Sequence, residues 1–385
     1  MGVAEGIKQT ASRVLYSEAV KGMTLIERGH PDEAERHLTA LLRSREKPGH
    51  VERRPMLMAR RVVGTAQYLT NRPFDALETC RTALGHAERY RDPALVFSLR
   101  SDLVAALGAA GRHSEAEAEV RLLCDGDAAN RGHIVHHYMG IFQLNQLLHM
   151  TGRLAEAVGA DTAVLPRMTD SLGPKHFLVL QCRAARARRL ALLGQFDQAE
   201  ADCADIVAIT AKWADKQWQM ANARRAALTA LAFCLTESGR PMEAERSVRS
   251  ALATAEQSHG VHSRDAQPLR YSLGFALVGQ KRYEEALALA DIRPAWGGFE
   301  IGDHHLLRAE ALYGLGRAKD AELAATHALN EAITKLAPSD HRVLRIRSVL
   351  AVIREAPGQL HALAAEWAQH YGPNHPRTRA AQAAL

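Results

Sequence analysis

The chain has 385 residues and carries 49 lysines and arginines against 43 aspartates and glutamates, which gives a formal net charge of +6. Aromatic residues make up only 5% of it, while Ala, Leu, Arg and Glu are abundant. This composition favours helices over strands, so the sequence predicts an all-α protein and argues against a β-rich fold.

Cysteines and apolar runs indicate where the chain resides. The five cysteines are odd in number and include no C-x-x-C pair, which argues against a disulfide framework and a zinc–thiolate site. The first twenty residues contain no apolar run of signal-peptide length, and no stretch approaches the roughly 20 apolar residues of a membrane-spanning helix. We expect a cytoplasmic protein with buried, reduced thiols and no membrane segment.

A short turn recurs nine times along the chain as a small or turn-forming residue, four variable positions and then Ala. It occupies residues 29–34, 71–76, 111–116, 152–157, 194–199, 239–244, 281–286, 316–321 and 357–362. The closing alanines are 35 to 45 residues apart. Periods in this range are typical of stacked supersecondary units, and they predict a right-handed α-solenoid of about nine helix-turn-helix repeats.

The third repeat illustrates the expected helix pair. Apolar residues recur at helical spacing on both sides of Gly111, at Leu95, Leu99, Leu103 and Leu107 before it and at Ala116, Val120 and Leu123 after it. We expect Gly111 to end the first helix in a left-handed conformation. Ala116 is small, which lets the two helices approach closely.

One segment breaks the regular pattern. The spacing falls to 35 between Ala286 and Ala321, and the segment 293–303 carries Pro294 and a Gly297–Gly298 pair, which helix interiors tolerate poorly. The second helix of the seventh repeat is therefore expected to be short. The segment is either a hinge or ligand-facing loop that exposes Trp296 and Phe299, or a filler that packs both rings into the gap.

A small residue twelve positions before the turn Ala and a large one three residues later recur in most repeats. The small residues are Gly22, Gly64, Ala187, Ala232, Gly274 and Ala309, and the large ones are Leu25, Leu190, Leu235, Leu277 and Leu312. This pattern resembles tetratricopeptide repeats, and the match extends over residues 1–371, with 372–385 as a C-terminal cap. The long period and loops such as GPKH at 173–176 resemble the kinesin-light-chain-like subclass of actinobacterial type. Val104 and Asn145 depart from the small-residue pattern.

The resemblance implies that the first helices line a concave groove, with inward positions fifteen, eleven and eight residues before the turn Ala. Applied here, it selects Arg61, Thr65, Tyr68, Phe142, Gln146, His149, Arg188, Thr229, Phe233, Tyr271, Phe275, Glu310, Tyr313, Arg347 and Arg354. Aromatic rings offer contact area, and arginine pairs bidentately with carboxylates. The leading hypothesis is a non-catalytic scaffold or regulator that binds a protein or an apolar, acidic peptide in this groove. A small apolar acid is the smaller alternative ligand.

Two other function classes stay open. No H-E-x-x-H, G-x-S-x-G or phosphate-binding glycine loop is present, so no catalytic residue and no cofactor is predicted. A helical-repeat enzyme or a metal site near His133–His149 remains an alternative, because His133 and His137 share a helix face. Nucleic acid is the third candidate through arginine clusters such as 183–189, but it is disfavoured because acids nearly balance bases. Homo-oligomerisation through the solenoid ends or 293–303 is left open.

Overall fold

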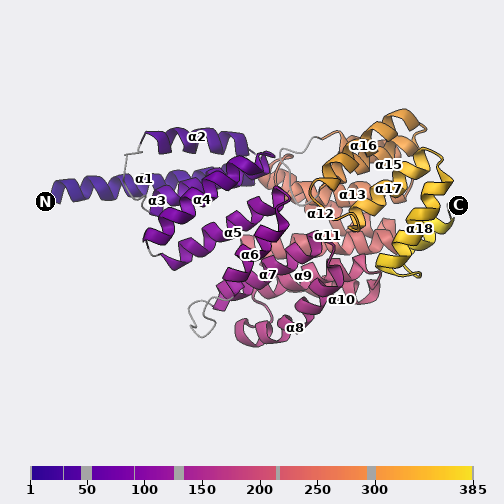
Figure 1. Cartoon of the computed structure of the whole chain (residues 1–385), viewed down its shortest axis with the longest axis horizontal. Helices are drawn as coiled ribbons and strands as arrows, with labels where there is room; N and C mark the ends of the chain where they lie inside the picture. The colour runs from indigo at the N-terminus through magenta and orange to yellow at the C-terminus, as the bar shows by residue number, and fades with distance from the viewer. Residues whose placement is uncertain are drawn as a thin grey trace. The chain divides into compact units, whose positions relative to one another are not determined.

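The computed structural model describes residues 2–28, 30–44, 54–90, 92–124, 134–213, 217–292 and 301–383, with the side chains of residues 2–13 and 90 excepted. Within these ranges the regular structure consists of 19 helices and no strand (Figure 1), which confirms the all-α prediction. The helices are α1 (Gly2–Glu27), α2 (Pro31–Arg43), α3 (Arg54–Leu69), α4 (Pro73–Tyr90), α5 (Pro93–Ala109), α6 (His113–Cys124), α7 (Ile134–Met150), α8 (Leu154–Leu172), α9 (Phe177–Leu192), α10 (Phe196–Thr210), α11 (Trp218–Glu237), α12 (Pro241–His259), α13 (Ala266–Gly279), α14 (Tyr283–Ala290), α15 (Asp303–Gly314), α16 (Ala318–Ile333), α17 (His341–Ile353), α18 (Pro357–Tyr371) and α19 (Pro376–Ala383).

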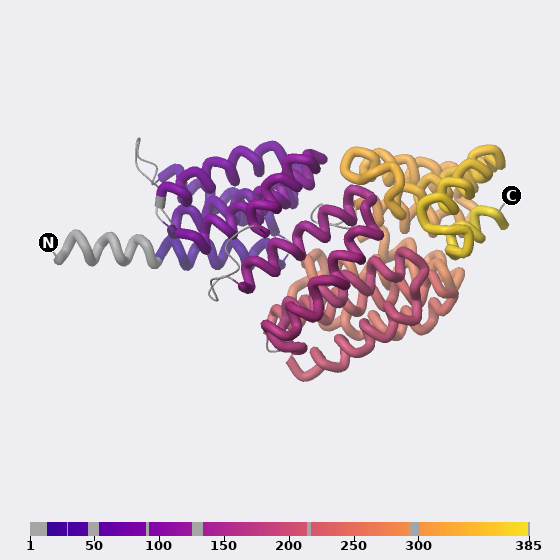
Figure 2. Tube along the Cα trace, turned by 60° about the horizontal axis from the view of Figure 1, so that its bottom comes forward, coloured from indigo at the N-terminus to yellow at the C-terminus, as the bar shows by residue number. Residues whose placement is uncertain are grey.

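The chain folds into two compact units. The N-terminal unit runs to Leu147 and includes His262–Arg264, so it contains α1 to α6 and most of α7. The C-terminal unit begins at Leu148 and contains the end of α7 and helices α8 to α19. From α1 to α6 in the N-terminal unit and from α9 to α18 in the C-terminal unit, each odd-numbered helix packs on the next even-numbered helix, and α19 packs on α18. The colours of Figure 2 follow the helices in this chain order.

The turns of the second to the eighth repeats have the geometry that their sequences predict. At Gly111 the backbone φ is 71°, a left-handed value that glycine adopts without strain, and the Arg112 N–H donates to the Leu107 carbonyl at 2.9 Å. Asn71, Lys281 and Glu355 adopt the same left-handed conformation without being glycines, with φ of 61°, 61° and 49°. The backbone hydrogen bonds of the turn therefore outweigh the strain of a side chain at these three positions.

The ninth turn lies two residues earlier than the sequence pattern placed it. Glu355 is the left-handed residue, α18 begins at Pro357, and the buried closing residue five positions after Glu355 is Leu360. Ala362, the predicted closing residue, is exposed. The prediction was wrong because Glu occupies a position where the pattern expects Gly, and Leu occupies one where it expects Ala.

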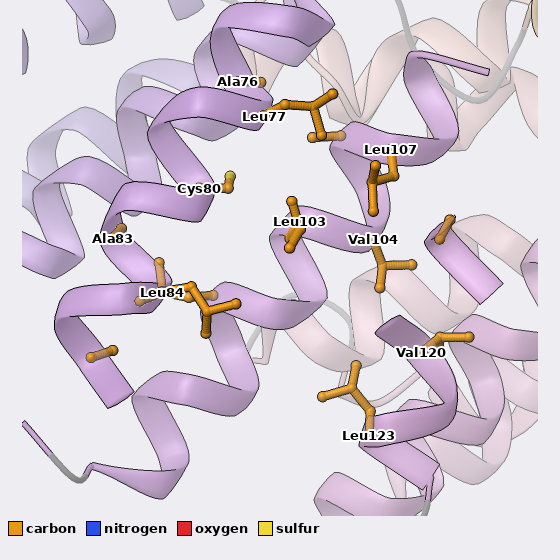
Figure 3. Close-up of a cluster of buried hydrophobic side chains, with 14 of the residues drawn as sticks. Ala76, Leu77, Cys80, Ala83, Leu84, Leu103, Val104, Leu107, Val120 and Leu123 are labelled. Atoms are coloured by element: carbon orange, nitrogen blue, oxygen red, sulfur yellow. The ribbon is translucent and has the colours of Figure 1, made fainter. Parts of the chain in front are cut away.

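The other eight closing alanines are buried, each with a relative exposure of 1% or less, where the two helices of a pair approach most closely. Figure 3 shows this packing in the N-terminal unit, where Ala76 and Leu77 of α4 lie in one apolar cluster with Leu103 and Leu107 of α5. Val120 and Leu123 of α6 extend the same cluster. Among the described residues the core is a series of apolar clusters between stacked helices, with no single central nucleus.

In the C-terminal unit the first helices of successive pairs pack against each other, α9 on α11, α11 on α13, α13 on α15 and α15 on α17. Gly274 of α13 makes this approach possible, because a Cβ atom there would collide with the Leu307 side chain of α15. Helix α14 has only eight residues, which confirms the short second helix predicted for the seventh repeat. Most of the adjoining segment 293–303, including Trp296 and Phe299, lies outside the described residues.

The two ends of the C-terminal unit are in contact with each other. His375, just before α19, hydrogen-bonds through Nε2 to the Leu192 carbonyl at the end of α9, 183 residues away, at 3.0 Å. Arg377 of α19 donates from Nε to Glu237 at the end of α11 at 2.6 Å. We call these two interactions the closing contacts. They join the last helix of the unit to its early repeats, so α19 links the two ends of the C-terminal unit.

Candidate functional site

Four residues from the predicted position eleven residues before the closing residue lie on the inner helices of the C-terminal unit: Arg188 on α9, Phe233 on α11, Phe275 on α13 and Glu310 on α15. The Arg188 Cζ atom lies 3.6 Å from the centroid of the Phe233 ring. Glu310 accepts a bidentate hydrogen bond from Arg345 Nη2 and Nε, at 2.9 and 3.1 Å, and the Arg345 Cζ atom lies 4.3 Å from the Phe275 ring centroid. In both places a guanidinium group stacks on an aromatic ring.

Arg345 takes the place that the sequence pattern gave to Arg347. Once the ninth turn closes at Leu360, the position fifteen residues earlier is Arg345. Arg347 instead donates to Glu366 of α18 at 2.6 and 2.7 Å, and Arg354 donates to Glu322 of α16 at 2.6 Å. The shift of two residues therefore puts Arg345, instead of Arg347, at the position fifteen residues before the closing residue.

One group of charged side chains on these helices is neutralised by ion pairs within the group. We call Glu237, Phe275, Glu310, Arg345 and Arg377 the paired cluster. Burial alone raises the pKa of the Glu237 carboxyl, but the Arg377 and Arg345 guanidiniums outweigh it and hold that pKa well below its ordinary value. Two arginines face two glutamates here, so the paired cluster leaves no charge free for a ligand.

A second group of side chains contains two charged residues without partners among the described residues. We call His149, Arg188, Phe233, Asp303 and His341 the unpaired cluster. Among the described residues no carboxylate lies within 4.0 Å of the Arg188 guanidinium, and that group donates no hydrogen bond. Burial lowers the pKa of Arg188 to about 10, and the nearby Asp303 carboxylate opposes this effect.

Asp303, the first residue of α15, is an acid that lacks a partner in the same way as Arg188. Over the part of the chain that the structure describes, its carboxylate has neither an ion-pair partner nor a hydrogen-bond donor. Burial raises its pKa, while Arg342 and Arg188 act in the opposite direction. The interior therefore holds one cation and one anion that the fold itself leaves unsatisfied.

Two histidines in the unpaired cluster are neutral. His341, only 3% exposed, is ringed by aromatic side chains, with its ring centroid 5.6 Å from that of Phe233 and 5.0 Å from that of Trp367. Its Nε2 atom is buried and has no hydrogen-bond partner among the described residues. Burial lowers the pKa of His341 well below its ordinary value and lowers that of His149 to about 3. Neither imidazole adds charge near neutral pH.

The remaining predicted groove residues have other environments. Tyr271 is 3% exposed and belongs to an apolar cluster of the C-terminal unit. Thr229 donates its hydroxyl to the Ala226 carbonyl at 3.0 Å, and Tyr313 is 41% exposed.

In the N-terminal unit, the predicted groove residues show a different pattern. Arg61 donates from Nε to Asp102 of α5 at 2.6 Å. Tyr68 packs partly buried against the apolar cluster, and burial raises its pKa. Phe142 and Gln146 are half-buried on α7. Arg61 thus has a carboxylate partner within its own unit, in contrast to Arg188.

The histidines proposed for metal binding are used otherwise or lie outside the described residues. His133 is outside them, and His137 Nδ1 lies 2.9 Å from the Cys124 carbonyl oxygen. The described residues contain no group of three or more His, Cys, Asp or Glu side chains arranged to hold a metal ion. Burial raises the pKa of the Cys80 and Cys203 thiols to about 12.

The arginine cluster at 183–189 is largely neutralised by acids. Arg183 and Arg186 both pair with Asp202 of α10, at 3.0 and 2.6 Å, and Arg189 is fully buried against Asp161 of α8. Only Arg188 of this cluster keeps an unpaired guanidinium among the described residues. The cluster therefore does not form the positive surface that a nucleic-acid binder needs.

Comparisons with known proteins give matches to a family model and to solved structures. A family model described as a tetratricopeptide repeat matches residues 17–38. Among solved structures, the chain is similar to a Rap protein complexed with competence and sporulation factor, with 12% identity over 96% of this chain and 98% of that chain and a TM-score of 0.47. It is also similar to a tetratricopeptide repeat protein from Parabacteroides merdae ATCC 43184, with 14% identity over 90% of this chain and 99% of that chain and a TM-score of 0.35. No curated protein sequence matches the chain.

The recurring left-handed turns, the stacked helix pairs and the absence of strands from the described ranges define a helical-repeat solenoid. Within this solenoid, residues 17–38 match a tetratricopeptide-repeat family model. The kinesin-light-chain-like subclass stays a prediction. Across the described ranges, none of the helices is both long and apolar enough to span a membrane.

Sequence reasoning missed His341, Arg345, Asp303 and the closing contacts. A signal for the correct ninth register was present: Pro occupies the third position of the turns at 29–34, 71–76 and 239–244, and Pro357 fits that position only if the turn starts at Glu355. Pro prefers the first helical position, because no backbone N–H is needed there. The contacts of His375 and Arg377 carry no such local signal, since they depend on the curvature of the whole unit.

Proposed function

We propose that this protein is a binding scaffold that holds a peptide or a peptide segment of a partner protein in the interior of its C-terminal unit. Arg188 is the anchor for an acidic group of that ligand. The observation that carries the proposal is the half-buried Arg188 guanidinium, stacked on Phe233 at 3.6 Å and without a carboxylate partner among the described residues.

The chemistry of Arg188 supports this role. A guanidinium removed from water without a partner loses solvation that nothing in the fold replaces. A ligand carboxylate would supply a bidentate, charge-assisted hydrogen bond, and the Phe233 face already restrains the guanidinium. The aromatic rings beside it offer contact to apolar side chains, and a small apolar acid is the minimal ligand of the same chemistry.

The proposal also includes a non-catalytic regulatory role in the cytoplasm. Binding changes the output of such a scaffold by favouring one arrangement of its repeats over another. Cys80, Cys182, Cys203 and Cys234 are buried free thiols, which suits a reducing compartment.

A peptide screen tests the proposal. The probe is a library of pentapeptides with apolar side chains and free carboxyl ends, detected by thermal shift and quantified by isothermal titration calorimetry. We expect Arg188→Gln to weaken the binding of every hit by about 10- to 100-fold, because a hydrogen bond to a charged group contributes about 1.5–3 kcal/mol.

Arg347→Gln is the matched control, since Arg347 lies on α17 but is paired with Glu366. It should leave the affinity of each hit unchanged. Hits whose affinity survives Arg188→Gln would place the ligand elsewhere and refute the anchor role.

A further inference from the structure

The unpaired cluster contains charges of both signs, and this constrains what can bind there. Arg188 and Asp303 are each without an ion-pair partner among the described residues, while the arginines and acids around them are satisfied. Arg342 pairs with Asp340 at 3.2 Å, and Glu331 accepts a hydrogen bond from the Gly302 N–H at 3.3 Å. One positive and one negative charge therefore remain.

Both charges lie near the N-terminal half of α17. On one side, Arg188 stacks on Phe233, whose ring centroid is 5.6 Å from that of His341, the first residue of α17. On the other side, a Cβ atom at Gly302 would lie 3.2 Å from Ile346 Cδ1, one helical turn beyond Arg342. Asp303 follows Gly302 directly, so the start of α15 lies beside this part of α17.

The two groups do not satisfy each other, although each is an electrostatic neighbour of the other. Arg188 is restrained by its stacking on Phe233, and Asp303 is fixed by its position as the first residue of α15. His149 and His341 are neutral and compensate neither charge. Leaving two opposite charges partly desolvated and apart is unfavourable unless a third group bridges them.

We infer that the ligand of the C-terminal unit is zwitterionic, with a carboxylate that pairs with Arg188 and an ammonium group that pairs with Asp303. Its apolar body contacts the Phe233 ring. A free-ended short peptide and a free apolar amino acid share this chemistry. The inference rests on the function proposed above and adds the positive group to the ligand.

The test compares matched forms of one probe series. The probes are phenylalanine and the peptides Leu-Phe, Leu-Ala-Phe and Leu-Ala-Ala-Ala-Phe, each with free ends, with an acetylated amino end and with an amidated carboxyl end. Isothermal titration calorimetry measures the affinity of the whole chain for each form. The probe length that binds tightest distinguishes a free amino acid from a peptide.

We expect the free-ended form to bind tightest and acetylation to weaken it by about tenfold or more, since it removes a charge-assisted hydrogen bond. In Asp303→Asn that acetylation effect should vanish, and in Arg188→Gln the amidation effect should vanish. Asp291→Asn is the control, because Asp291 is an exposed acid paired with Arg308, and it should keep both effects.

Each contrary result has a distinct meaning. If the acetylated probe binds the wild type as tightly as the free-ended probe, the zwitterion inference fails while Arg188 can still bind an acid. If acetylation weakens binding equally in wild type and Asp303→Asn, the assignment of Asp303 is wrong. If Arg188→Gln changes no affinity, or if no probe of the series binds, the proposed function fails as well.

A second measurement needs no ligand. Arg188→Met removes an unpaired, partly buried charge and keeps the aliphatic volume, so we expect it to raise the Tm of the ligand-free chain. The same variant should lose the stabilisation that the free-ended probe gives to the wild type. A lower Tm for Arg188→Met would show that the guanidinium is already satisfied and would overturn the inference.

Discussion

Two adjacent arginines of α9 have opposite environments. Arg188 is half-buried and has no carboxylate partner among the described residues. Arg189 is fully buried and pairs with Asp161 of α8. The side chains of Arg189 and Asp161 are both fully buried. A buried pair of this kind adds little net stability, because desolvation offsets the attraction, but removing one partner leaves a charge stranded.

We therefore expect Arg189→Met to lower the free energy of unfolding by about 3–5 kcal/mol. The double substitution Arg189→Met with Asp161→Leu should recover most of that loss, since it removes both charges. Urea denaturation followed by circular dichroism measures both variants. A double variant as unstable as the single one would mean that the loss comes from packing and not from the stranded charge.

The buried histidines make stability depend on pH. The pKa of His149 is about 3 in the folded protein and ordinary in the unfolded chain, and that of His341 is lowered in the same direction. Between the two pKa values the unfolded chain binds a proton that the folded protein does not, so stability is complete above about pH 6.5 and declines as the pH falls.

The expected slope is about 1.4 kcal/mol per pH unit for each such histidine once the pH is well below 6.5. His341→Phe should make the free energy of unfolding fall less steeply between pH 6.5 and 5, because it removes the contribution of one histidine. His361→Gln, at an exposed position on α18, is the control and should keep the wild-type slope. Urea denaturation at a series of pH values measures the slopes, and equal slopes in wild type and His341→Phe would contradict the assignment.

At the scale of the helices, the distance of closest approach is set by small residues. Gly274 of α13 faces Leu307 of α15 without room for a Cβ atom, whereas Gly159 in α8 has no atom within 4 Å of its Cβ position. Gly274→Ala should therefore destabilise the chain by about 1–3 kcal/mol through overpacking. Gly159→Ala should stabilise it by up to about 1 kcal/mol through helix propensity alone. Thermal unfolding of the two variants should give Tm shifts of opposite sign; shifts of the same sign would contradict this account.

The same local signals explain how much of the molecule could be predicted. Turn residues and the spacing of apolar positions predicted the helix pairs, because the left-handed residue and the closing Ala act within one pair. They failed at Glu355, where backbone hydrogen bonds hold a non-glycine residue in the left-handed conformation. That one failure displaced the predicted groove from Arg345 to Arg347.

Side-chain partners were beyond the reach of the sequence. Arg61, Arg188 and Arg345 looked alike as arginines on first helices, yet Arg61 pairs with Asp102 and Arg345 with Glu310. The partners lie 41 and 35 residues away and have no fixed spacing in the repeat. Only the folded arrangement separates the satisfied guanidiniums from the unsatisfied one.

At the scale of the whole C-terminal unit, the closing contacts give a testable feature. Arg377→Gln weakens the contact to Glu237, so we expect faster hydrogen exchange in residues 190–196, next to the Leu192 carbonyl that His375 contacts. Arg379→Gln is the control, since the exposed Arg379 side chain hydrogen-bonds only to Asn374 among the described residues. Hydrogen–deuterium exchange with mass spectrometry reads both variants, and unchanged exchange in Arg377→Gln would show that α19 does not hold the two ends together.

The contact between His375 and Leu192 also bears on how the C-terminal unit gains its stability. A repeat array whose units touch only their neighbours folds as a row of nearly additive pieces, and shortening it removes stability in steps. A bond across 183 residues adds a loop-closure entropy that must be overcome before the bond contributes, and it couples the first pieces to the last. Progressive shortening from α19 inward should therefore lower the sharpness of the urea transition at the first cut, as the unit changes from one cooperative block to a chain of weakly linked ones.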